Sequence, residues 1–108
     1  MNARNPVSPP FVINQRVETL PTEHLGTLTI TGMEIPRLQQ LLADHGKPDD
    51  SDLFGRRLVC ETVTGPNGER FTVEQLAHLP AFVLRDYSKI VDAAQRVCGL
   101  MRDAVEKA

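Results

Sequence analysis

Histidine and cysteine are the residues of this chain that could hold a metal ion, but their spacing is unsuited to it. A metal site needs imidazole or thiolate ligands that cluster. Cys60 and Cys98 lie far apart, and His24, His45 and His78 follow no ligand spacing. Surface positions or helix ends are the simpler interpretation of these histidines. We therefore expect no metal site and no cofactor.

The serine and glycine residues form no motif for nucleophilic catalysis or phosphate binding. Ser8 lies near the N-terminus, Ser51 has the position of a helix cap, and Ser88 falls on a helix flank. None of them sits in a nucleophile elbow. Gly65 and Gly68 flank a turn without the Lys-Ser/Thr pair that follows a phosphate-binding loop. We predict that the protein is not an enzyme.

Composition sets further limits on function. The 12 basic and 14 acidic residues give a net charge of −2. These charges are mixed along the chain, so no basic stripe exists to follow phosphates, and nucleic-acid binding by charge alone is disfavoured. Residues 1–6 lack the apolar core of a signal peptide, and no apolar run is long enough to span a bilayer. We expect a cytosolic protein that does not contact membranes.

The N-terminal third predicts a β-hairpin. Residues 1–10 contain three prolines and are expected to form a flexible segment, followed by a single small domain over 11–108. Residues 11–20 favour a strand, and 25–31 alternate between apolar and threonine positions. Leu28 and Ile30 should share the buried face. Such a hairpin is marginal alone and must pack on helices.

Two helices are expected next. The first begins either with a capping box at Thr31 or slightly later, which would put Pro36 in its favoured early position, and it ends before Gly46. Its predicted apolar face consists of Ile35, Leu38, Leu41 and Leu42. A second helix is expected over roughly 52–62 from its caps and stops. Its predicted buried set is Leu53, Phe54, Leu58 and Val59.

A turn and a short helix follow. Residues 65–68 have the composition of a turn, with Asn-Gly supplying positive φ angles, so Val63 and Phe71 should face each other across a very short hairpin. A second capping box begins at Thr72 and opens a helix to about His78.

The last helix is predicted to be the longest. It should start with Pro80 in its first position, and Asp92 and Arg96 should pair on its polar side. Gly99 either ends the helix or is crossed at a cost of about 1 kcal/mol. The predicted fold class is thus α+β and mostly α: an N-terminal β-hairpin packed on a small bundle of about four helices with a long C-terminal helix.

The order of these segments resembles the tail assembly chaperones of long-tailed bacteriophages and prophages. The similarity is one of pattern and extends over roughly residues 17–100. It rests on the segments 26–32, 57–63 and 97–100, on Gly68, and on Phe71-Thr72, Glu74-Gln75 and Leu79-Pro80.

The resemblance implies a non-enzymatic protein in the host cytoplasm. Members of this family coat the tape-measure protein until tail-tube subunits polymerise around it, and many also exist in a frameshifted longer form. The family has no fixed catalytic residues. An apolar helix face would be the binding surface, with a homo-oligomer also possible.

The candidate partner-binding residues form a heptad-like stripe on the last helix. Most of this stripe is expected to pack inside the domain, and its C-terminal part is the best candidate for binding a partner or a second copy. The stripe consists of Val83, Tyr87, Ile90, Ala94, Val97, Met101 and Val105. Two alternatives remain: another small phage structural or adaptor protein that uses the same helix, or a helix-turn-helix DNA-binding regulator that uses residues 72–95.

Overall fold

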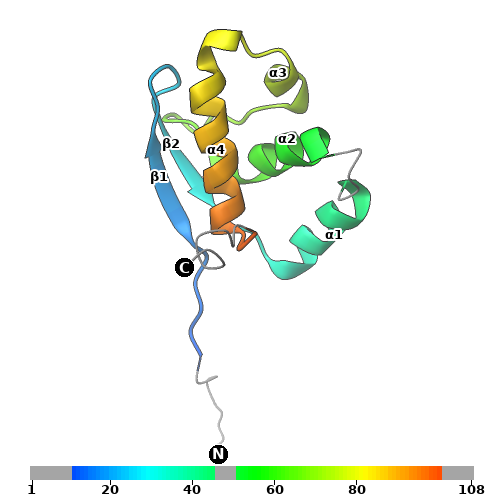
Figure 1. Cartoon of the computed structure of the whole chain (residues 1–108). Coiled ribbons are helices and arrows are strands. Elements are labelled where there is room, and N and C mark those ends of the chain that lie inside the picture. The colour runs from blue at the N-terminus through cyan, green and yellow to red at the C-terminus, as the bar shows by residue number, and fades with distance from the viewer. Residues whose placement is uncertain (1–10, 46–50, 101–108) are drawn as a thin grey trace, which may run out of the picture.

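The computed structural model describes residues 11–45 and 51–100, and Figure 1 shows their arrangement. The predicted flexible segment 1–10, Gly46, and the part of the candidate stripe at Met101 and Val105 lie outside these residues. The elements in chain order are β1 (Val17–Pro21), β2 (Thr27–Thr31), α1 (Ile35–His45), α2 (Ser51–Thr62), β3 (Val63–Thr64), α3 (Val73–Ala77), the short 3-10 helix η2 (Ala81–Val83) and α4 (Leu84–Val97). This confirms the predicted α+β, mostly helical fold class.

The predicted hairpin is formed by β1 and β2, which pair antiparallel with Val17 opposite Thr31. Leu28 and Ile30 are buried on one face of β2, as their alternation predicts. The first strand is shorter than expected, because pairing begins only at Val17 and residues 11–16 lie outside it.

The short strand β3 corrects the prediction for the segment after α2. Val63 pairs with Ile30 and Thr64 with Thr29, so β3 becomes the third strand of the sheet in the order β1-β2-β3. Val63 therefore does not face Phe71 across a hairpin of its own. The turn itself is confirmed, with Gly68 at φ 84. The prediction of a local hairpin was wrong because Val63 pairs with β2, which is a longer strand with a buried face.

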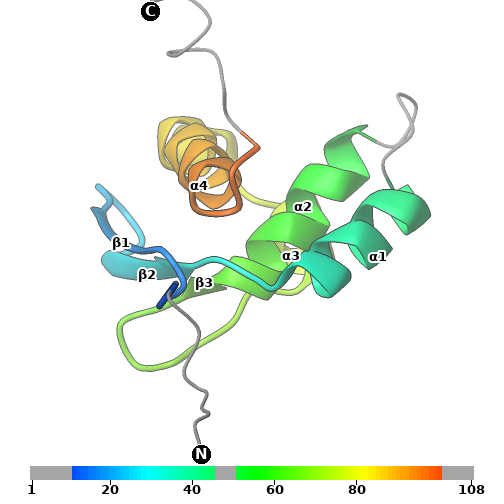
Figure 2. The same cartoon turned by 90° about the horizontal axis from the view of Figure 1, so that it is seen from below.

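One face of the sheet is covered by α4, and the α1–α2 pair lies beside it (Figure 2). The core forms where these layers meet, and its fully buried side chains come from β2, α2, β3 and α4. They include Leu28, Ile30, Leu58, Val59, Val63, Ile90, Ala93 and Ala94. Seen from below, the loop 65–71 passes on the side of the sheet away from α4.

In α1 and α2, only some of the residues of the predicted apolar faces are buried. In α1, Leu41 is buried and Leu38 is half-buried, whereas Ile35 and Leu42 are exposed. In α2, Leu58 and Val59 are buried and the earlier pair of the predicted set is half-buried. The face of α1 was overestimated because this helix packs mainly on α2 and not on the sheet. The start of α1 at Ile35 gives Pro36 its favoured early position.

The C-terminal elements begin and end close to the predicted points. Thr72 and Gln75 form the predicted capping box of α3. Pro80 precedes the 3-10 helix as its cap instead of occupying the first helical position. Arg96 pairs with Glu18 of β1 at 2.9 Å and not with Asp92, because the strand lies within reach of α4.

Candidate functional site

An apolar groove of about 210 Å³ opens between α3, η2 and the first turn of α4. Most of its lining is apolar, which suits a partner's apolar side chains better than a polar substrate. The groove is lined by Leu76, Leu79, Pro80, Ala81, Val83, Leu84 and Tyr87.

Local sequence explains why these side chains converge. The Thr72 hydroxyl accepts the Gln75 N–H at 3.1 Å, which fixes the start of α3 and directs Leu76 inward. Pro80 holds the chain extended between the two helices, at φ −61 and ψ 148. In the following turn Val83 is buried, while Leu84 stays 64% exposed at the rim of the groove.

A buried carboxylate joins the start of α4 to the hairpin turn. Asp86 accepts the backbone N–H of Glu23 at 3.0 Å and that of His24 at 2.9 Å. The hydrogen bond from Glu23 is the main reason that the pKa of Asp86 lies below its ordinary value, with the bond from His24 adding to it. Two donors from the turn therefore keep this carboxylate charged and fix the turn against α4.

The same turn contacts the exposed side of η2. The rings of His24 and Phe82 meet edge to face, with centroids 4.9 Å apart and planes at 88°. Phe82 is nevertheless an exposed large apolar side chain next to the groove, like Leu84. Their exposure leaves apolar surface on both sides of the buried Val83.

Tyr87 is the one lining residue of the groove whose side chain carries a polar group. Its side chain is half-buried, and burial raises the pKa of its hydroxyl. The hydroxyl therefore remains protonated near neutral pH and can act as a hydrogen-bond donor.

The candidate stripe on α4 is placed mostly inside the protein. Val83, Ile90, Ala94 and Val97 are buried in the core, and Tyr87 is half-buried. Those four side chains hold the folded domain together, so they present little surface to a partner. The apolar surface that does remain near the stripe comes from Phe82 and Leu84. Leu84 lies outside the heptad-like stripe, so the spacing of apolar residues did not predict it as a site residue.

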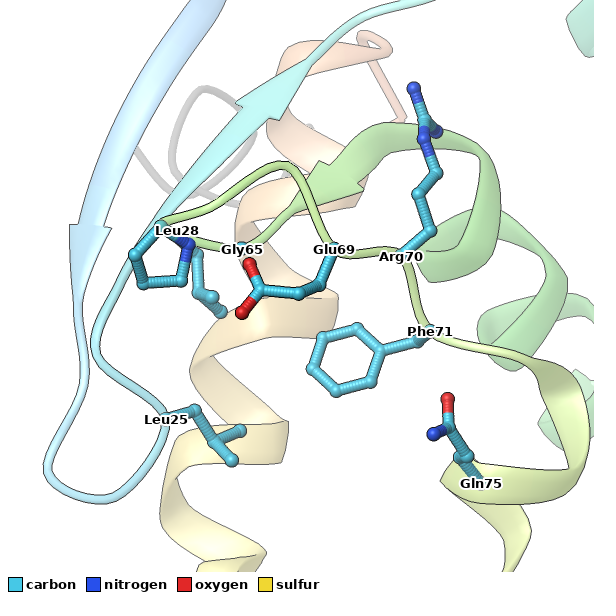
Figure 3. Close-up of a pocket in the computed structure, with 8 residues that line it drawn as sticks. Leu25, Leu28, Gly65, Glu69, Arg70, Phe71 and Gln75 are labelled. Carbon is cyan, nitrogen blue, oxygen red and sulfur yellow. The ribbon is translucent and has the colours of Figure 1, made fainter.

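A second hollow, also of about 210 Å³, lies between the hairpin and the loop 65–71 (Figure 3). Leu25, Leu28 and Phe71 give it an apolar floor. Its polar side chains already form hydrogen bonds within the protein.

Each polar side chain of this second hollow forms a hydrogen bond within the protein. Glu69 accepts the Asn67 N–H at 2.7 Å, Gln75 belongs to the capping box, and Arg70 donates to the backbone carbonyl of Glu61 at 3.1 Å. In Figure 3 the Arg70 guanidinium points away from the hollow. We therefore favour the groove at α3 and α4 as the functional site.

Residues with metal or thiol chemistry form no site in the described part of the chain. No group of three or more His, Cys, Asp and Glu side chains there could hold a metal ion. Cys60 and Cys98 are free, and burial raises the pKa of both thiols, which favours their unreactive protonated form.

Comparisons with known proteins found no matching family model, no similar curated protein and no similar solved structure. Within residues 11–45 and 51–100, no helix has the length and apolar character needed to cross a bilayer.

Proposed function

We propose that the protein is a tail assembly chaperone of a long-tailed bacteriophage or prophage, which binds the tape-measure protein and is released as the tail tube polymerises. The order of sequence segments that resembles this family supports the proposal. The exposed apolar groove supports it independently, because a chaperone for a long helical protein needs a surface that accepts an amphipathic helix.

The groove is the observation that carries the proposal. Apolar side chains of a partner helix, spaced three and four residues apart, would enter between α3 and α4. There they would contact Leu79 and Leu84, which are half-buried and exposed respectively. The Tyr87 hydroxyl could donate to a polar group of the same helix. The groove thus offers apolar contact with little polar selectivity, as a protein that binds many similar stretches of one long partner requires.

The small size of the groove fits reversible binding. A cavity of about 210 Å³ holds only a few side chains. Surfaces much smaller than a standard protein interface give weak and transient complexes. A tail-tube subunit that polymerises along the tape-measure protein could then displace each copy of the chaperone.

Co-expression with fragments of the tape-measure protein from the same genome tests the proposal. We expect the full chain to co-purify with at least one helical fragment, and Leu84→Gln to reduce the amount retained at least tenfold. Leu42→Gln is the matched control, because Leu42 is an exposed helical leucine outside the groove. Failure of every fragment to co-purify, or equal loss with both variants, would contradict the proposal.

The adaptor alternative uses the same groove with a different partner. The position of the gene separates the two, because a tape-measure gene directly downstream favours the chaperone. The DNA-binding alternative is less favoured, because the basic and acidic residues are mixed along the chain and form no basic stripe that could follow phosphates. Absence of DNA retention at low salt would remove it.

A further inference from the structure

The outer edge of β1 is unpaired in the described part of the chain. β1 is the first strand in the order β1-β2-β3. The Gly32 N–H donates to the Arg16 carbonyl, and the Thr22 N–H donates to the Gly26 carbonyl. Since hydrogen bonding alternates along an antiparallel strand, even-numbered residues of this strand face β2 and odd-numbered residues turn their N–H and C=O groups outward. Such an edge is a template for another strand.

Large apolar side chains accompany this edge. Phe11 and Ile13 are 73% and 86% exposed, and they belong to the segment that precedes β1 in Figure 1. Val17 is 58% exposed and Ile35 is 71% exposed. Ile13 and Ile35 line one shallow groove at the start of α1. Exposed apolar side chains near a free edge are typical of an interaction site.

We propose that this edge pairs with the same edge of a second copy, as an antiparallel dimer whose two-fold axis passes between the two Val17 residues. Val17 would then face Val17 of the second copy, Gln15 would face Thr19, and Ile13 would face Pro21. All of these are odd-numbered residues. With residues 13–16 extended as a continuation of β1 in the dimer, their outward N–H and C=O groups meet in register. A pairing of identical surfaces closes with two copies and leaves no further edge.

Charge complementarity selects a second copy as the occupant. In this register Arg16 of each copy lies opposite Glu18 of the other, so each interface contains two pairs of opposite charge. Glu18 also holds Arg96 in its own copy through two hydrogen bonds, which keeps its carboxylate in place. Centring the pairs on Gln15 instead would put Arg16 opposite Asn14 and lose this match.

Pro21 sets the end of the pairing. Its ring nitrogen carries no hydrogen, so Pro21 can accept a hydrogen bond from the Ile13 N–H of the second copy through its carbonyl oxygen but cannot donate one. The hydrogen-bonded ladder therefore runs from Ile13 to Pro21 in both copies. The groove between α3 and α4 contains none of these residues, so dimer formation and partner binding use separate surfaces.

Sedimentation equilibrium of the full chain tests the dimer. We expect the wild-type chain to show a dimer mass, and Val17→Lys to raise the dissociation constant at least tenfold, because two like charges would face each other at the axis. Leu42→Lys adds the same charge at an exposed position on α1 and should leave the dissociation constant unchanged. A wild-type monomer at all concentrations, or an equal effect of both variants, would overturn the proposal.

Cysteine substitution tests the register. Facing residues of a hydrogen-bonded antiparallel pair lie about 5.5 Å apart at Cα, within reach of a disulfide. We expect Val17→Cys to form a cross-linked dimer under mild oxidation and Gln15→Cys not to. Cross-linking of Gln15→Cys alone would overturn the proposed register. Val17→Lys should still retain the helical partner, so loss of the dimer and loss of partner binding are distinguishable.

Discussion

At the scale of single residues, Asp86 is the side chain on which the site depends most. It is buried, yet its charge is balanced by two backbone N–H groups of the hairpin turn and by its place in the first turn of α4. By holding the turn it also places His24 against Phe82 at the edge of the groove. One carboxylate therefore joins the start of α4 to a hairpin turn that is remote from it in sequence.

Asp86→Asn should destabilise the protein although it is nearly isosteric. An amide has only one acceptor oxygen, so one of the two turn N–H groups would lose its bond and meet an N–H donor instead. We expect the Tm, followed by circular dichroism, to fall by roughly 5 °C. Asp92→Asn removes the same charge from an exposed position on the same helix and should hardly change the Tm. Equal effects of the two variants would show that charge alone, not the bonds to the turn, matters.

At the scale of elements, the end of α4 shows how local sequence fixes a boundary. Gly99 has φ 73, its N–H donates to the Arg96 carbonyl, and the Leu100 N–H donates to the Gln95 carbonyl at 2.8 Å. This is a Schellman motif, in which the residue after the cap must adopt a left-handed conformation. The sequence left open whether the last helix ends at Gly99 or continues through it. In the structure α4 ends at Val97, before Gly99.

Two glycine substitutions should have opposite effects. Gly55 lies within α2 with space around the position of a Cβ, so Gly55→Ala should raise the free energy of unfolding by about 1 kcal/mol. Gly99→Ala meets no steric contact either, but its positive φ is strained for alanine, and we expect a loss of about 1 kcal/mol. Urea denaturation measures both. A stabilising Gly99→Ala would mean that α4 continues past its observed end.

Local patterns predicted the elements well, and remote contacts account for what they missed. The capping box at Thr72 and the alternation around Leu28 are written in neighbouring residues, so both were confirmed. The pairing of Val63 with β2, the bond of Arg96 to Glu18 and the role of Asp86 depend on residues far away in sequence. No local sequence pattern predicts these three long-range contacts. For the candidate site, the sequence pattern selected a stripe on α4 whose members Val83, Ile90, Ala94 and Val97 are buried in the core.

At the scale of the whole molecule, α4 closes a small core with β1 running beside it (Figure 1), and exposed apolar side chains remain near both ends of this helix. The groove lies at its start, and the exposed edge of β1 lies toward its end. A chain of this size buries little more than one core, so exposed side chains such as Leu84 and Ile13 are available for binding. Separate surfaces allow a dimer to hold a partner at two points, which would raise its avidity.

Acid should destabilise this fold. The pKa of Asp86 is lowered by the backbone of Glu23, that of Glu18 by its hydrogen bond from Arg96, and that of Glu61 by its hydrogen bond from Arg37. A carboxyl whose folded pKa lies below its unfolded value stabilises the protein above the unfolded pKa, and this contribution is lost as the pH falls through the folded pKa.

The free energy of unfolding should therefore decline as the pH is lowered from about 5 toward 2, because the unfolded carboxyls titrate near their ordinary values. Urea titrations at a series of pH values measure this decline. The Asp86→Asn variant should show a shallower decline, since one contributing carboxyl is absent. A stability that rises on acidification would contradict the electrostatic account.

Chemical-shift mapping on the ¹⁵N-labelled full chain tests the central claim, that the groove receives an apolar helix, most directly. Titration with a tape-measure segment that co-purifies with the chain should shift the backbone amides of Leu79, Leu84 and Tyr87. The chemical shifts of the β1 amides should not change, and Leu84→Gln should abolish the changes at the groove. Shifts confined to β1 or α1 on binding of such a segment, with the groove amides unmoved, would contradict the account.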